Sequence, residues 1–112
     1  MLTSGDVVRA DLGLPAGREA GFVRLVVVVT AQGVLDQGPN VVHVVPLTSR
    51  LRPRRVEVGL DPDAANGLDA ASAAQCQHVR AVAVERLGPV IGNVGPADVA
   101  RIREVVGLLL GL

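Results

Sequence analysis

Two short, continuous runs of β-branched residues dominate the hydrophobic pattern of this 112-residue chain. Residues 25–30 (LVVVVT) form the first run and residues 41–47 (VVHVVPL) the second. Each run is too short for a helix of ordinary length and too rich in valine to favour one, so both predict buried strands. Arg24 directly precedes the first run, and Thr48 and Ser49 directly follow the second. A planar guanidinium and two hydroxyls at the ends of neighbouring strands suit the binding of one phosphate group.

The remaining segments predict more strands, separated by glycine- and proline-rich connections. We expect strands at residues 6–12, 23–30, 41–47, 54–60, 73–84 and 87–94. Residues 13–22 carry three glycines and a proline and predict a long, mobile loop, whereas residues 33–40 and 61–67 predict turns. The chain shows no linker or repeat, so residues 1–112 are expected to form one domain.

The C-terminal segment predicts a single amphipathic helix after Gly95 and Pro96. Proline near the first helical position and Asp98 in the first turn both favour a helix start. An apolar stripe follows at three- and four-residue spacing, made of Val99, Ile102, Val105, Val106 and Leu109. Many short strands closed by one helix predict a mainly β (α+β) fold, a small antiparallel barrel or curled sheet that the helix caps. No helix-length segment separates the early strands, which disfavours a parallel βαβ sheet.

Composition limits the classes of partner. The chain is 49 % hydrophobic with Phe22 as its only aromatic residue, so the core must be aliphatic. All eleven basic residues are arginines and the formal net charge is zero, which argues against coating nucleic acid by bulk charge. A local basic cluster exists at Arg50, Arg52, Arg54 and Arg55. This cluster is either a solvated hairpin that protects a strand edge or a phosphate contact.

A lone cysteine and the absence of long apolar stretches indicate the compartment. Cys76 has no partner in the chain for a disulfide, and a structural role is expected for its thiol. No stretch approaches the length that spans a membrane, and no signal-peptide pattern opens the sequence. We therefore expect a soluble, cytoplasmic protein.

Several motifs in order along the whole chain carry a family likeness. They are GDVV and DLG at the start, EAG and Arg24 before the valine run, VPLTS at residues 45–49, CQHVRAV at 76–82, ERLG at 85–88, and LLLGL at the end. In this pattern the chain resembles the MazF/PemK toxins, sequence-specific endoribonucleases of bacterial type II toxin–antitoxin systems. The resemblance implies an SH3-like (CcdB/PemK-type) barrel, a homodimer and a cognate antitoxin whose flexible tail blocks the cleft. It also implies cleavage of single-stranded RNA without a metal or other cofactor.

The resemblance assigns roles to particular positions. Arg24 matches the family's catalytic arginine and Thr48 its catalytic threonine, while Glu19 and Ser49 match positions near the site. Three residues depart from the family pattern: Arg9 replaces a common aromatic, Leu25 replaces a proline, and His78 replaces a frequent glutamine. The departures at Arg9 and His78 bear on RNA recognition more than on the chemistry.

The residues themselves suggest further supporting roles in RNA binding. Glu19 could orient Arg24 through an ion pair or remain an exposed loop carboxylate. Phe22 could stack on a base or fold into the barrel mouth. Arg50 belongs to the basic cluster, and His78 is a better candidate for RNA contact than His43, which alternates with valines within a predicted strand.

Two alternative functions remain open at this level. One is a non-catalytic toxin similar to the gyrase poison CcdB, which uses the same barrel to bind a protein target. The other is a decayed member that binds only antitoxin or RNA, a reading made plausible by Arg9, Leu25 and the shortage of aromatic residues. Arg24 and Thr48 together favour the endoribonuclease, which would leave a 2′,3′-cyclic phosphate and a 5′-hydroxyl.

Overall fold

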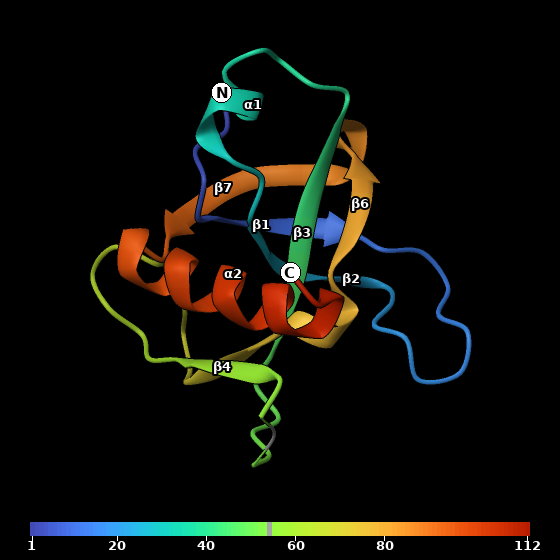
Figure 1. The fold of residues 1–112 in the computed structure, drawn as a ribbon, viewed down its shortest axis with the longest axis vertical. Coiled ribbons are helices and arrows are strands. Elements are labelled where there is room, and N and C mark those ends of the chain that lie inside the picture. The colour runs from blue at the N-terminus through green and yellow to red at the C-terminus, as the bar shows by residue number, and fades with distance from the viewer. Residues whose placement is uncertain (54) are drawn as a thin grey trace.

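The predicted strands form one antiparallel, strongly curled sheet with a helix packed across it (Figure 1). A computed structural model describes residues 1–53 and 55–112. The elements in chain order are β1 (Asp6–Asp11), β2 (Val23–Val28), α1 (Gln32–Leu35), β3 (Val41–Thr48), β4 (Glu57–Leu60), β5 (Ser72–Gln75), the 3₁₀ turn η1 (Cys76–His78), β6 (Arg80–Ala83), the 3₁₀ turn η2 (Val84–Arg86), β7 (Leu87–Asn93) and α2 (Pro96–Leu110). The strand order is β4-β5-β3-β2-β1-β7, and β6 pairs with β3. The antiparallel barrel with a C-terminal helix is confirmed.

The middle parts of the two valine runs lie at the centre of this sheet and are buried on both faces, whereas Val41 at the start of β3 is 47 % exposed. Val27 and Val45 pack into a cluster beneath α2, whereas Val26 and Val44 pack into a second cluster on the opposite side. Alternate residues of a strand point to opposite faces, so a strand covered on both sides needs an unbroken apolar run. The continuous runs thus reflect two hydrophobic clusters that share the same strands.

The segment expected to be one strand at residues 73–84 is divided into two. Leu47 of β3 pairs with Ala74 of β5, and Val44 of β3 pairs with Arg80 of β6. From Leu47 to Val44 the chain moves three residues along β3, whereas from Ala74 to Arg80 it moves six residues along the paired segment. The three extra residues form η1. The prediction of a single strand was wrong because both halves pair with the same strand in registers that differ by three residues.

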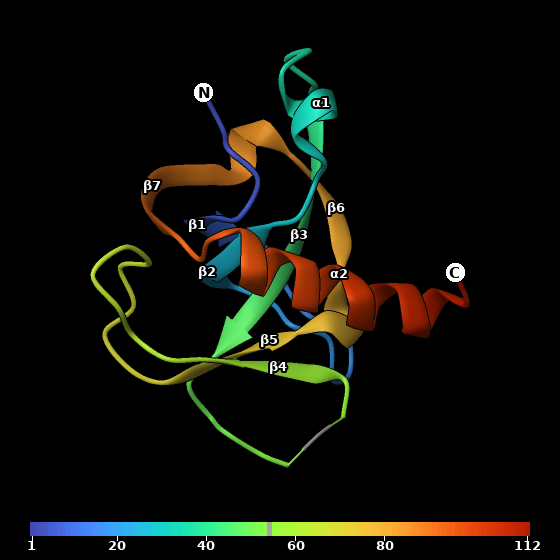
Figure 2. The same cartoon turned by 60° about the vertical axis from the view of Figure 1, so that its left-hand side comes forward.

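The C-terminal helix begins and ends close to the predicted positions. Pro96 opens α2, and Gly111 ends it in the left-handed conformation at φ 73°, where its N–H donates back to the last turn of the helix. Ile102, on the face of α2 that packs on the sheet, is fully buried, whereas Leu109 near the C-terminal end of α2 is 42 % exposed. The apolar stripe is thus core in its first half and partly exposed in its second. Figure 2 shows α2 lying between the β4–β5 pair and the strands β1, β2 and β3.

Two other segments differ in detail from the expected elements. Residues 33–40 contain the end of α1, a single helical turn, in addition to turns. The strand expected at 54–60 begins at Glu57, and Arg54 lies outside the described residues. Within the part of the chain that the structure describes, no helix has the length and apolar character needed to cross a membrane.

Candidate active site

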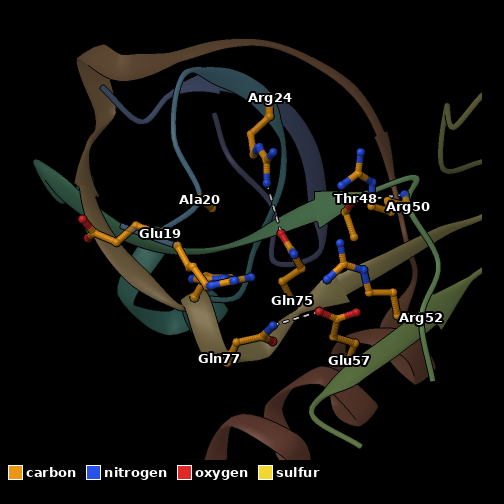
Figure 3. Close-up of a pocket in the computed structure, with 11 residues that line it drawn as sticks. Glu19, Ala20, Arg24, Thr48, Arg50, Arg52, Glu57, Gln75 and Gln77 are labelled. Carbon is orange, nitrogen blue, oxygen red and sulfur yellow. Dashed lines mark hydrogen bonds between the residues drawn. The ribbon is translucent and has the colours of Figure 1, made fainter. Parts of the chain in front are cut away.

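A cleft of about 670 Å³ opens at the edge of the barrel away from the core beneath α2 (Figure 3). Side chains from the β1–β2 loop, from β2 and β3, from the connection after β3, and from β4, β5 and η1 surround it. The lining residues are Arg18, Glu19, Ala20, Arg24, Thr48, Arg50, Arg52, Glu57, Gln75, Gln77 and His78. The cleft therefore collects polar groups from segments far apart in the sequence.

The register of β2 and β3 explains why Arg24 and Thr48 line the same cleft. Val26 pairs with Pro46, and the two neighbouring pairs toward the start of β3 follow the same register. The pairing ends at the first of these pairs, and the same register extended by two residues aligns Arg24 with Thr48. Paired residues of an antiparallel sheet share a face, so both side chains point away from α2.

The next two strands add Gln75 and Glu57 to the same face. Ala74 pairs with Leu47 and packs into the cluster beneath α2, so its neighbour Gln75 points to the opposite side. Glu57 is the direct partner of Gln75 across β4 and β5. Four adjacent strands thus present Arg24, Thr48, Gln75 and Glu57 on one continuous surface.

A neutral amide holds the Arg24 guanidinium in place. Arg24 Nη1 donates to Gln75 Oε1 at 3.1 Å, and Figure 3 shows the guanidinium directed at that amide. A guanidinium has five N–H donors, and within residues 1–53 and 55–112 Arg24 uses one of them, which leaves donors for a ligand. Thr48 Oγ1 accepts a hydrogen bond from the backbone N–H of Arg50 at 3.1 Å. This contact leaves the Thr48 hydroxyl proton available for donation into the cleft.

The β1–β2 loop contributes one wall of the cleft and is closed at its base. The Leu12 N–H donates to the Phe22 carbonyl at 2.9 Å, and the Phe22 N–H donates to the Gly13 carbonyl at 2.6 Å. Within the loop, Glu19 Oε1 accepts the Ala16 N–H at 2.8 Å. The suggested ion pair between Glu19 and Arg24 is therefore wrong: the carboxylate stabilises its own loop, and Gln75 is the partner of Arg24.

The 3₁₀ turn η1 places one side chain in the core and two at the cleft. Cys76 is buried, with burial raising the pKa of its thiol to about 11, whereas Gln77 and His78 line the cleft. Gln77 Nε2 donates to Glu57 Oε2 at 2.8 Å (Figure 3). The second carboxylate oxygen of Glu57, Oε1, and the amide oxygen of Gln77, Oε1, are both buried and accept no hydrogen bond from the described residues.

Cations outnumber anions in the cleft. Four arginines line it (Arg18, Arg24, Arg50 and Arg52), against the carboxylates of Glu19 and Glu57. Among the described residues the one ion pair within 4 Å joins Arg101 and Asp98 on α2, so these arginines are not neutralised by direct pairing. A cleft with uncompensated guanidinium groups attracts a polyanion.

The structure brings together most, though not all, of the residues singled out from the sequence. Arg24, Thr48, Glu19, Arg50 and His78 line the cleft. Phe22 and Ser49 do not line it; Phe22 is 62 % exposed with a positive φ of 59°, and Ser49 is exposed. The pattern reasoning missed Gln75, Gln77 and Glu57. Alternation of Glu57 with buried Val58 was the one available signal, because it places Glu57 opposite the core.

A model of the family described as "PemK-like, MazF-like toxin of type II toxin-antitoxin system" matches residues 3–110 of the chain. Among curated proteins, the chain is 33 % identical to the Endoribonuclease MazF9 of Mycobacterium tuberculosis (strain ATCC 25618 / H37Rv) over 116 residues. That match covers all of this chain and 98 % of the relative.

Solved structures share the fold. MazF (Form-I) from Deinococcus radiodurans is similar with a TM-score of 0.79 and 27 % identity, over 97 % of this chain and 96 % of that one. An endoribonuclease in complex with its cognate antitoxin from a Mycobacterial species gives a TM-score of 0.76 at 21 % identity, over 100 % and 97 % of the two chains. The second likeness concerns the fold alone.

Proposed function

Because this chain belongs to the PemK-like, MazF-like toxins of type II toxin–antitoxin systems, we propose that its cleft cuts single-stranded RNA at a short recognition sequence without a metal ion. The observation that carries the proposal is that Arg24 and Thr48, from two different strands, line one cation-rich cleft. A guanidinium and a hydroxyl on the same phosphate suit phosphoryl chemistry.

The reaction needs little more than alignment and charge stabilisation from the protein. RNA carries its nucleophile, the 2′-hydroxyl, beside the scissile phosphate. Attack of that oxygen on phosphorus forms the 2′,3′-cyclic phosphate and expels the 5′-oxygen of the next nucleotide. Arg24 and the Thr48 hydroxyl donate to the phosphate oxygens as negative charge develops, and each such donor contributes about 3–4 kcal/mol in comparable sites. Gln75 orients Arg24 without neutralising its charge.

Two protons must move during the step. The 2′-hydroxyl loses one, and the departing 5′-oxygen gains one to leave as a hydroxyl. A guanidinium remains charged up to a very high pH, so Arg24 acts chiefly as electrostatic stabiliser. Histidine is the side-chain type that accepts protons near neutral pH, which makes His78 the cleft residue best suited to take the 2′-hydroxyl proton.

Partners follow from the family and from the exposed surface. The protein acts as the toxin of a pair, and its cognate antitoxin blocks the cleft in the resting cell. It forms a homodimer, for which the exposed Leu108 and Leu110 at the end of α2 and Leu112 just beyond it provide apolar surface. Messenger RNA, the substrate class, places its action in the cytoplasm.

Cleavage of a long RNA in EDTA tests the proposed activity. Wild-type protein should give discrete fragments with 2′,3′-cyclic phosphate ends. Arg24→Ala and Thr48→Ala should each lower the rate at least 100-fold. Arg101→Ala, which removes an exposed arginine from α2, serves as the matched control and should cut at the wild-type rate.

Two outcomes would overturn the proposal. Intact RNA across varied substrates would reject the nuclease and favour a toxin that binds a protein target. Full activity of Arg24→Ala in a folded protein would remove this residue from the mechanism.

A further inference from the structure

We propose that Glu57 and Gln77 form a guanine-binding subsite beside the scissile phosphate, an inference that rests on the RNA-cleaving function proposed above. The two side chains are joined by the hydrogen bond from Gln77 Nε2 to Glu57 Oε2 at 2.8 Å. Both line the cleft, and Figure 3 shows them along its floor, on the α2 side of Gln75. They place a carboxylate and an amide side by side in a cleft where arginines outnumber carboxylates.

The position of Glu57 relative to Arg24 sets which part of the RNA it meets. Gln75 accepts from Arg24 and is the direct cross-strand partner of Glu57. Directly opposed residues of an antiparallel pair have Cβ atoms about 4.5–5.5 Å apart. A phosphate held by Arg24 therefore leaves the attached nucleotide within reach of Glu57.

The negative charge of Glu57 favours a base over a phosphate in the part of the cleft that Glu57 and Gln77 line. Glu57 carries no ion pair within 4 Å among the described residues, so its carboxylate repels a phosphate. The arginines of the cleft suit the RNA backbone, whereas Glu57 suits a neutral group that donates hydrogen bonds. Base edges of single-stranded RNA are such groups.

The unsatisfied acceptors define the edge that fits. Glu57 Oε1 and Gln77 Oε1 are buried and accept nothing from the described residues, although buried polar atoms nearly always have a partner. The missing partners must therefore be donors. Both oxygens are inaccessible to solvent in this structure, so the side chains of Glu57 and Gln77 must rotate before a base can contact them.

Guanine is the base that best supplies these donors. Its Watson–Crick edge presents the N1–H and the N2 amine side by side, and a carboxylate can accept both. Uracil presents one N–H between two carbonyl oxygens, and those oxygens would face the acceptors of Glu57 and Gln77. Adenine and cytosine each offer a single amine beside an acceptor nitrogen. The pair therefore selects guanine most strongly against uracil.

Sequencing the cut ends of a randomised RNA library tests the subsite. Wild-type protein should show a guanine preference at one position next to the cut. Glu57→Gln replaces one acceptor oxygen by an amine of similar shape and should reduce that preference roughly 10- to 100-fold, with the rest of the recognition sequence retained. Glu104→Gln makes the same change on the exposed face of α2 and should leave the profile unchanged. A wild-type profile without guanine, or an unchanged profile in Glu57→Gln, would overturn the subsite.

Binding of uncleavable oligonucleotides separates failure of the subsite from failure of the nuclease. DNA-type oligouridylates lack the 2′-hydroxyl, and one central guanine should tighten binding to wild-type protein relative to the all-uracil strand. Inosine, which lacks the N2 amine, should lose part of that gain, and Glu57→Gln or Gln77→Met should lose most of it. If wild-type protein cuts no RNA but shows this guanine effect, the nuclease proposal fails and the subsite stands. Equal affinity for both strands would reject the subsite whether or not the protein cuts.

Discussion

The hydrogen bond between Arg24 and Gln75 yields the sharpest prediction, because a change of one atom type in Gln75 alters the charge of the site without altering its shape. Arg24 Nη1 donates to the amide oxygen of Gln75 at 3.1 Å in a partly buried setting. Gln75→Leu removes this acceptor. Gln75→Glu keeps an acceptor at the same place but adds a negative charge against the guanidinium.

The two variants should lower the cleavage rate by different amounts. A hydrogen bond to a charged group contributes about 1.5–3 kcal/mol, and each 1.36 kcal/mol is a factor of ten in rate. Loss of positioning in Gln75→Leu should therefore reduce kcat about 10- to 100-fold. In Gln75→Glu the carboxylate neutralises Arg24, which is equivalent to losing a donor to the transition state, and kcat should fall about 100- to 1,000-fold.

Single-turnover cleavage of a fluorophore–quencher RNA under saturating protein measures this difference directly. Gln37→Glu adds the same charge in an exposed turn away from the cleft and controls for the change in net charge. Thermal unfolding of each variant checks that the fold is retained. Cleavage by Gln75→Glu at or above the rate of Gln75→Leu would show that the neutrality of the amide is unimportant, and the argument for its role would be refuted.

Three further predictions test the cleft charge, the core thiol and the helix packing. Arg52→Gln should lower the slope of log affinity against log salt for an uncleavable single strand by about 0.7, measured by fluorescence anisotropy; an unchanged slope would remove Arg52 from phosphate contact. Burial raises the pKa of the Cys76 thiol from 9.0 to about 11, so the native state favours the neutral thiol, and its contribution to stability is complete below pH 9 and lost as pH rises toward 11. The chain contains no lysine or tyrosine side chain that would titrate over the same pH range. The urea midpoint should therefore fall between pH 9 and 11 in wild-type protein and stay level in Cys76→Ala. An equal fall of the midpoint in both proteins would show that the Cys76 thiol is not its cause. Ile102→Ala should lower the free energy of unfolding by about 2–5 kcal/mol in urea titrations, and a loss below 1 kcal/mol would mean that α2 does not seal the core.

The strands and the C-terminal helix were predictable from the sequence where burial leaves a hydrophobic pattern within a single element. A continuous apolar run such as residues 25–30 indicates a strand that is covered on both faces. The apolar stripe around Ile102 indicates a helix that packs on an apolar surface. The interruption at Cys76 was not predictable in the same way. Its cause is the pairing of both flanking strands with β3, a long-range relation that leaves no periodic signal in residues 73–84.

The candidate site was predictable in part for a similar reason. Arg24 and Thr48 stand at the ends of clear strands, so their placement in one cleft follows from the register of β2 and β3. Gln75 directly precedes the unpredicted 3₁₀ turn and Gln77 lies within it, so without that turn the direction of their side chains could not be assigned. Their catalytic and binding roles, like those of Arg24 and Thr48, stay predictions until variants are measured.

The hydrogen bonds that join Leu12, Gly13 and Phe22 at the base of the β1–β2 loop have an evolutionary consequence. They join the two ends of the loop, so an insertion or deletion within residues 14–21 can change the loop without displacing β1 or β2. Arg18 and Glu19 can then be substituted or shifted, while Arg24 keeps its position in β2 directly after these hydrogen bonds. We therefore expect related chains to differ more in the length and sequence of this loop than at the arginine that follows it.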